Sequence, residues 1–268
     1  MTESFVFLGV GNVALHLARL LSRRCTIYGT TRSVERVSVL ESAGIEPVVV
    51  DSKPPAASLF ENANVLVSFP PDGATDLSWS ERCLKARRII YISSTGVYGK
   101  TSGVIDESSP VDASEPSAAR RLKAEEVWRN KGAIILRCPG LYAAESGMHL
   151  RINQVKIPGD GSRFVSRIHL DDLARIIEAC FARESLELST YVVGDLQPST
   201  HLETITWLCQ AMGAELPDFA PIDQVTPTLR GNRQVDSSRL LKELSITLQY
   251  PTYKEGYREI LSHSARLS

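Results

Sequence analysis

The sequence lacks the features of a membrane-spanning or exported protein. No apolar run among its 268 residues approaches the ~18–20 residues needed to cross a bilayer. The first residues, Met-Thr-Glu-Ser, contain no basic segment of the kind that opens a signal peptide. We therefore expect a cytoplasmic protein without a membrane partner.

An excess of charge of either sign is also missing. Thirty Lys and Arg residues balance 31 Asp and Glu residues, for a formal net charge of -1. A nucleic-acid-binding protein normally presents a basic face, so we expect no nucleic-acid partner. The five cysteines form no C-x-x-C pair, and an odd number of them suits a reducing compartment.

Clusters of metal-ligating residues are absent as well. His169 precedes two aspartates, but no second histidine stands nearby at ligand spacing. We expect Asp171 or Asp172 to cap the helix that follows, and we expect no metal site. The chain also has no G-x-S-x-G segment of the hydrolase type.

Short apolar runs are present instead, and helix-length segments separate them. Such runs without alternation are typical of strands that are covered on both faces of a parallel sheet. Six of them precede residue 140, as in a doubly wound sheet. They are residues 5–9, 26–29, 47–51, 64–68, 88–93 and 133–137. The sequence predicts an α/β Rossmann fold with a small C-terminal substrate lobe.

The pattern loosens after Pro139, where glycine and polar residues become frequent. We predict a dinucleotide-binding domain over residues 1–140, to which residues 163–195 return. Residues 141–268 then form a small, discontinuous substrate-binding lobe. Expected helices cover residues 13–21, 33–42, 202–212, 236–244 and 253–261.

The turn after the first expected strand fits the pattern G-x-G-x-x-A. Gly9 permits a tight turn, and Gly11 lets a pyrophosphate approach the backbone because it has no Cβ atom. Asn12 and Val13 open a helix, whose N-terminus offers free N–H groups to phosphates. This segment predicts a dinucleotide site; the alternative is a plain strand-to-helix turn.

The end of the second expected strand distinguishes NADP from NAD. NAD sites usually place a carboxylate here, whereas this chain has Gly29-Thr30-Thr31-Arg32-Ser33. Arg32 can pair with a 2′-phosphate, and Thr31 can add a donor. We predict NADP as the cofactor, with NAD as the less favoured one. The alternative is that Arg32 is only a solvated residue of the next helix.

Two further segments are assigned to the adenosine by position alone. Asp51 ends the third expected strand, where a carboxylate can accept a hydrogen bond from the adenine amino group. The segment Ser68-Phe69-Pro70 follows the fourth strand and should border the adenosine.

The segment Ser93-Ser94-Thr95-Gly96-Val97-Tyr98-Gly99 resembles the S-S-x-x-V-Y-G segment of extended short-chain dehydrogenases, the NAD(P)-dependent epimerase/dehydratase family. Further resemblances follow in the family's order. They are Asp106-Glu107, Leu136-Arg137 with Tyr142, and Ile168-His169-Leu170-Asp171-Asp172. The segments 121–125 and 250–256 resemble an atypical branch of small bacterial members.

The resemblance implies roles for particular residues. A hydroxyl binds the substrate oxygen, a tyrosine transfers the proton, and a lysine bonds the nicotinamide ribose. By position, Ser94 matches the hydroxyl and Lys123 the lysine, and the predicted catalytic residues are Ser94, Tyr98 and Lys123. Ser93, Lys123 and Pro139 are also expected at the cofactor, and Ser94, Thr95, Tyr98 and Tyr142 at the substrate.

One departure from the family concerns the catalytic tyrosine. It should lie four residues before Lys123, where this chain has Ala119. Three interpretations stay open. Tyr98 or Tyr142 supplies the proton, the reaction needs no such acid, or the chain binds NADP without turnover. Tyr98 has the further alternative of packing under its loop.

The leading hypothesis is an NAD(P)-dependent oxidoreductase or epimerase/dehydratase-like enzyme. Its expected substrate is a small carbonyl, hydroxyl or sugar-like compound. The second hypothesis is an NADP-binding regulatory or sensor protein, and the third is a scaffold that binds no nucleotide. A homodimer is compatible with the sequence.

Overall fold

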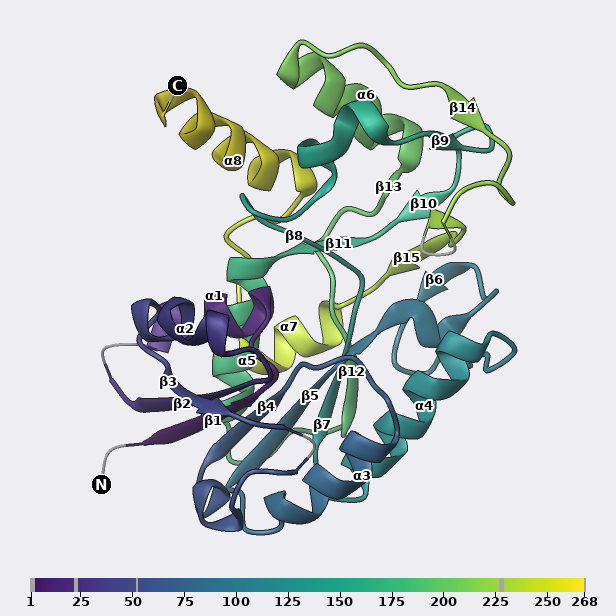
Figure 1. The fold of residues 1–268 in the computed structure, drawn as a ribbon. Helices are drawn as coiled ribbons and strands as arrows, with labels where there is room; N and C mark the ends of the chain where they lie inside the picture. Colours follow the sequence, from purple (N-terminus) through teal and green to yellow (C-terminus); the bar gives the residue numbers. More distant parts are fainter. Residues whose placement is uncertain (1–2, 22–23, 52, 227–228, 268) are drawn as a thin grey trace. The chain divides into compact units, whose positions relative to one another are not determined.

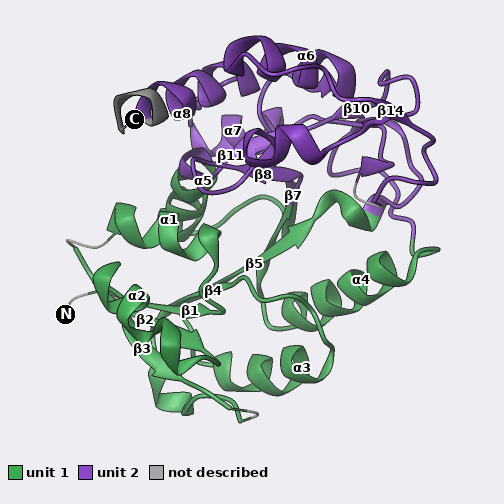
Figure 2. Ribbon diagram, turned by 45° about the horizontal axis from the view of Figure 1, so that its top comes forward, with its two compact units in different colours: residues 1–97, 113–137, 173–191 green, residues 98–112, 138–172, 192–268 purple. Residues whose placement is uncertain are grey.

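The structure is a computed structural model, and it describes residues 3–21, 24–51, 53–226 and 229–267. The chain divides into two compact units, which Figure 2 shows in different colours. Unit 1 contains residues 1–97, 113–137 and 173–191, and unit 2 contains residues 98–112, 138–172 and 192–268.

A seven-stranded parallel sheet forms the centre of unit 1, and its order is β12-β7-β5-β4-β1-β2-β3. The strands are β1 (Ser4–Leu8), β2 (Thr26–Thr31), β3 (Glu46–Val49), β4 (Asn64–Val67), β5 (Arg88–Ser94), β7 (Ile134–Cys138) and β12 (Thr190–Val192). The predicted α/β Rossmann-like class is confirmed, and each of the six expected apolar runs overlaps a strand of this sheet.

Both faces of this sheet are buried, which explains the continuous apolar runs. Val6 and Leu8 of β1 pack in one cluster with Val65 and Val67 of β4 and with Trp128. The intervening residues of the two strands point to the opposite face and are equally buried. Successive strand residues alternate between faces, so a strand covered on both sides must be apolar at every position.

Helices cover the two faces of the sheet. They are α1 (Asn12–Leu21), α2 (Val37–Ser42), α3 (Ala74–Ser80), α4 (Pro116–Arg129) and α5 (Leu170–Ala182). Figure 1 shows α1 and α2 on one face and α3 and α4 on the other. Shorter 3-10 turns are η1 (Val34–Arg36), η2 (Ala57–Phe60), η3 (Glu81–Cys83) and η4 (Thr95–Tyr98).

The described part of unit 2 contains short strand pairs and helices. The pairs are β6 (Gly103–Ile105) with β15 (Arg233–Val235), β8 (Gly140–Tyr142) with β11 (Arg167–His169), β9 (Ile157–Pro158) with β14 (Phe219–Ala220), and β10 (Phe164–Val165) with β13 (Ser199–Thr200). The helices are α6 (His201–Met212), α7 (Ser238–Leu244) and α8 (Tyr253–Leu267), together with η5 (Met148–Gln154).

The units place one segment differently from the expected domains. Residues 98–112 lie in unit 2, although the expected Rossmann domain covers residues 1–140. The reason is that β6 pairs with β15, more than a hundred residues later. Residues 173–191 lie in unit 1.

At the start of α5, a histidine side chain accepts from the backbone of the first turn. The Nδ1 atom of His169 accepts a hydrogen bond from the backbone N–H of Asp171 (3.2 Å). Asp172 is buried, and its carboxylate accepts hydrogen bonds from the backbone N–H groups of Gln249 (2.7 Å) and Tyr250 (2.8 Å). Asp172 therefore ties the segment before α8 to the start of α5.

All five cysteines are free, and four of them are buried. Within the described ranges, no helix is both long and apolar enough to span a bilayer. In the part of the chain that the structure describes, no group of three or more His, Cys, Asp or Glu side chains is arranged to hold a metal ion.

Candidate functional site

The turn between β1 and α1 is held by its neighbours on both sides. The backbone N–H of Gly9 donates to the Thr30 hydroxyl at the end of β2 (2.8 Å), and the Gly9 carbonyl accepts from the Ser68 hydroxyl after β4 (2.6 Å). Gly9 has a φ of +81°, and a Cβ atom here would lie 2.8 Å from the Cβ atom of Phe69. Only glycine satisfies both the backbone angle and the close approach.

Gly11 has the opposite environment. It is exposed, and a Cβ atom at this position would have no heavy atom within 4 Å. Its open side lies at the N-terminus of α1, where Asn12 is exposed and the first backbone N–H groups of a helix have no partner within that helix. This arrangement leaves room for a phosphate at a favourable end of the helix dipole.

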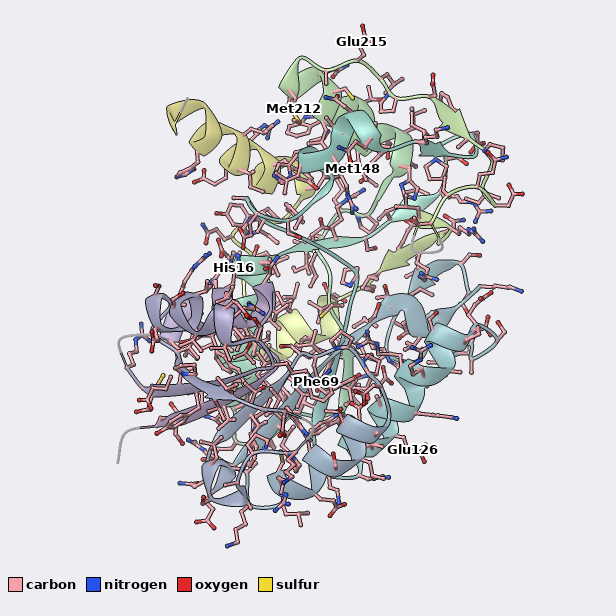
Figure 3. All side chains as sticks on the ribbon, viewed as in Figure 1. His16, Phe69, Glu126, Met148, Met212 and Glu215 are labelled. Atoms are coloured by element: carbon pink, nitrogen blue, oxygen red, sulfur yellow. The ribbon has the colours of Figure 1, made fainter. Side chains whose placement is uncertain are left out.

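A cavity of about 570 Å³ opens beside this turn, within unit 1. Its walls come from the carboxyl ends of four neighbouring strands, which is where open α/β sheets bind ligands. Phe69, which Figure 3 labels, belongs to the wall after β4. The lining residues are Gly9, Val10, Gly11, Thr30, Thr31, Arg32, Ser33, Arg36, Val50, Ser68, Phe69, Pro70, Pro71, Asp72, Thr75 and Trp79.

The charges of the cavity are gathered on one side. Arg32 and Arg36 follow β2, and Asp72 precedes α3. An Nη2 atom of Arg32 lies 3.7 Å from a carboxylate oxygen of Asp72 and 3.4 Å from the Thr75 hydroxyl. Burial raises the pKa of Asp72, but the hydrogen bonds from Thr75 and the Arg32 charge outweigh it, so the net pKa is lowered. Asp72 is therefore ionised at neutral pH.

The structure brings together seven of the residues that were predicted at the cofactor. They are Gly9, Gly11, Thr31, Arg32, Ser68, Phe69 and Pro70. Asp51 does not line the cavity; it is exposed, its carboxylate accepts from the backbone N–H of Lys53, and Val50 forms the wall instead. Asn12 and Val13 stand in the first turn of α1, outside the lining.

Sequence reasoning missed Arg36, Asp72, Thr75 and Trp79 as cavity residues. The signal for Asp72 was an aspartate just before a helix, a common position for a residue that accepts from the first-turn N–H groups. The sequence offered no indication that α3 begins beside Arg32, because 40 residues separate the two segments.

The helical phase of α4 decides which cation faces the sheet. Lys123 is exposed, whereas Arg121 is half-buried and donates to the Tyr91 hydroxyl (3.3 Å) and to the Ile92 carbonyl (3.4 Å) of β5. Ala119 is partly exposed. The ribose contact of Lys123 stays a prediction, and Arg121 is the residue of α4 whose positive charge lies against β5.

A buried carboxylate joins three strands near the predicted catalytic serine. Glu125 of α4 accepts hydrogen bonds from the Ser93 hydroxyl (2.6 Å), from Arg137 of β7 (2.7 and 3.0 Å) and from Arg129 (3.3 Å). Arg129 also donates to Thr190 of β12. The Ser93 side chain thus faces this network, while Ser94, the next residue, accepts from the backbone N–H of Gly96 (3.1 Å).

The remaining predicted residues follow β5 and β7. Thr95 is buried in η4, and Pro139 is half-buried between β7 and β8. In unit 2, Tyr98 is fully buried and its hydroxyl donates to the Asp106 carbonyl (3.2 Å). This bond fits the packing interpretation of Tyr98.

Tyr142 is buried in the aromatic core of unit 2, beside Tyr257 and His169. Its hydroxyl has no hydrogen-bond partner within the described part of the chain. Burial raises the pKa of Tyr142 far above its ordinary value, which makes it a poor proton donor. Gly256 leaves space for the ring, since a Cβ atom there would lie 2.2 Å from the hydroxyl oxygen.

Asp195, a buried carboxyl group of unit 2, is expected to make stability depend on pH. Burial raises the pKa of Asp195 to about 7, against roughly 3.9 in an unfolded chain. Between these values the folded protein holds a proton that the unfolded chain has lost, so this group's stabilising contribution falls as pH rises from about 4 to about 7. Replacing it with asparagine should raise the free energy of unfolding at pH 8 by a few kcal/mol.

The measurement is the difference in unfolding free energy between Asp195→Asn and the wild type at pH 4, 6 and 8. The gain should be small at pH 4, where the folded carboxyl group is protonated and the unfolded one is about half protonated, and it should vanish below that pH. Burial lowers the pKa of His201 to about 4, which gives the wild type an opposing slope, but this contribution cancels in the difference. An equal difference at all three pH values would contradict the expectation.

Comparison with known proteins supports the fold. No protein-family model matches the sequence. Protein YeeZ of Escherichia coli (strain K12) is 24% identical over 276 residues, which cover 93% of this chain and 97% of YeeZ.

Three solved structures have the same fold over nearly the whole of both chains. A functionally unknown conserved protein from Silicibacter pomeroyi DSS has a TM-score of 0.86 at 26% identity and covers 98% of this chain and 99% of its own. A protein from Methylobacillus flagellatus that is considered an NAD-dependent epimerase/dehydratase has a TM-score of 0.81 at 24% identity, covering 99% and 100%. UDP-glucuronic acid 4-epimerase from Bacillus cereus, in complex with NAD, has a TM-score of 0.79 at 18% identity, covering 97% and 99%.

The expected resemblance is confirmed at the level of structure. The chain is structurally similar to the NAD-dependent epimerase/dehydratase family over its full length, and its Rossmann-like sheet matches the sheets of those proteins.

Proposed function

We propose that unit 1 binds NADP, with the adenosine half in the cavity beside β1 and β2. The observation that carries the proposal is the open backbone at Gly11 next to a cavity lined by Arg32 and Arg36. The open backbone at Gly11 leaves room for a pyrophosphate, and the two arginines can pair with a 2′-phosphate. No carboxylate ends β2, where an NAD site usually has one.

The preference for NADP rests on Arg32. Arg32→Ala is expected to weaken NADPH binding about ten- to a hundredfold, since a hydrogen bond to a charged group contributes roughly 1.5–3 kcal/mol. NADH affinity should stay within about twofold, because NADH has no 2′-phosphate. Fluorescence titrations of NADPH and NADH with the wild type and with Arg32→Ala measure the change in affinity for each dinucleotide. Equal losses for both dinucleotides would remove the argument for NADP.

For the chemistry, we propose an oxidoreductase or epimerase/dehydratase-like reaction on a small carbonyl, hydroxyl or sugar-like compound. When bound, the nicotinamide would supply or accept the hydride. Ser94 would bind the substrate oxygen, and Lys123 would contact the nicotinamide ribose. Support comes from the epimerase-like fold and from the position of Ser94 at the carboxyl end of β5.

A regulator or sensor that binds NADP without turnover is the second candidate. Two observations favour it: Ala119 stands at the usual tyrosine position, and the Tyr98 hydroxyl is bonded to a backbone carbonyl. A screen of small carbonyl compounds with NADPH separates the candidates. Turnover that Ser94→Ala reduces supports the enzyme, and tight NADPH binding without any turnover supports the sensor.

The location, the partner and the assembly of the protein are proposed from its sequence. We propose a cytoplasmic protein with a small-molecule partner, and a homodimer stays compatible with the chain. Elution volume in size-exclusion chromatography, with and without NADPH, tests the assembly.

A further inference from the structure

We infer that Asp72 limits the preference for NADP, because its carboxylate competes with the 2′-phosphate for Arg32. This inference rests on the proposed NADP site and adds a specificity-determining residue to it. The two side chains meet in the cavity lining, although 40 residues separate their segments, one after β2 and the other before α3.

Asp72 is held in place independently of Arg32. Its carboxylate accepts hydrogen bonds from the backbone N–H of Thr75 (2.7 Å) and from the Thr75 hydroxyl (2.6 Å). The backbone of the same segment is fixed by Asp76, which is buried and accepts from the N–H groups of Asp72 (3.1 Å) and Gly73 (3.0 Å). Trp128 in turn donates to Asp76 (2.9 Å). The negative charge at residue 72 therefore stays at the cavity.

Arg32 has no comparable anchor. Its side chain is largely exposed, and its partners in the described structure are Asp72 and Thr75. An exposed ion pair of this kind is weak, so the Arg32 guanidinium can leave Asp72 and pair with a phosphate. The carboxylate then remains a few ångströms from a group that carries nearly two negative charges. The repulsion opposes NADPH, whereas NADH brings no charge to this position.

The experiment compares dissociation constants of NADPH and NADH for the wild type and Asp72→Asn. Asparagine keeps an oxygen that accepts from the Thr75 N–H and removes the charge. We expect NADPH to bind about three- to tenfold tighter and NADH to change by less than about twofold. Asp72→Ser introduces a second uncharged residue that can cap the helix. It should also tighten NADPH binding and leave NADH binding nearly unchanged.

Glu61→Gln is the matched control. Glu61 forms an exposed ion pair with Lys85 (2.9 Å), so this change also removes one carboxylate and one surface pair. Glu61 precedes β4, at the end of the strand away from the cavity, and we expect it to leave both affinities unchanged. A control that tightens NADPH as much as Asp72→Asn would reduce the effect to overall charge and overturn the inference.

The outcomes separate this inference from the proposed function. If the wild type binds neither dinucleotide, the proposed function fails. If it binds both but Asp72→Asn keeps the NADH to NADPH ratio, the site stands and the role of Asp72 is wrong. Weaker NADPH binding in both variants of Asp72, with unchanged thermal unfolding, would show that Asp72 positions Arg32 for the phosphate instead of competing with it.

Discussion

Gly11→Val is expected to weaken NADPH binding on the order of a hundredfold, while the free energy of unfolding changes by no more than about 1 kcal/mol. The valine side chain would occupy the open space beside the N-terminus of α1, where nothing lies within 4 Å of a Cβ atom. It would keep phosphate oxygens away from two or more backbone N–H groups. Each such hydrogen bond contributes roughly 1.5–3 kcal/mol.

Two measurements are needed for this prediction: a fluorescence titration with NADPH, and denaturant unfolding. Gly11→Ala is the graded variant, and its single methyl group should weaken binding less. Gly9 is the contrasting position, because its positive φ and its contact with Phe69 make any side chain costly to the fold itself. Wild-type affinity in Gly11→Val would place the phosphates away from this turn.

Glu125→Ala is expected to lower the free energy of unfolding by about 3–5 kcal/mol. The change removes the carboxylate that pairs with Arg137, a buried arginine, and that accepts from Ser93. Losing one partner of a buried ion pair leaves the other charge without compensation in a medium where it is poorly solvated. The strands β5 and β7 would also lose their shared link to α4.

Glu126→Ala is the control for this second prediction. Glu126 is the next residue of α4, it is exposed, and Figure 3 shows its side chain pointing away from the helix into solvent. We expect its replacement to change stability by less than about 0.5 kcal/mol. Urea unfolding of the three proteins measures both differences. Similar losses for the two variants would show that the removal of any carboxylate from α4, not the loss of the buried network, explains the effect.

Several motifs that resemble the epimerase family have packing roles in this structure. Arg137 and Glu125 pair inside unit 1, and Asp172 holds the backbone before α8 in unit 2. Gly256 accommodates the Tyr142 ring. A motif in one sequence does not reveal whether its residues bind a ligand or stabilise the fold, since both depend on the elements that surround it.

The cations of α4 show what the helical phase adds to sequence spacing. Counting residues from Ser94 selected Lys123 as the cation of this helix. Lys123 is exposed, and its contact with the ribose stays a prediction, while Arg121 donates to the Tyr91 hydroxyl of β5. A difference of two residues rotates a side chain by about 200° around a helix, so the helical phase matters more than the separation along the chain.

The sequence by itself determined the features that depend on local order along the chain. Apolar runs separated by helix-length segments predicted the parallel sheet, and the Gly9–Ala14 turn with Arg32 predicted a dinucleotide site at the first two strands. Only the tertiary structure showed that Asp72 meets Arg32, and that Val50, not Asp51, lines the cavity. The physical reason is that backbone periodicity and turn geometry depend on neighbouring residues, whereas a charge pair in the wall of a cavity depends on where the packed sheet places two segments that are distant in sequence.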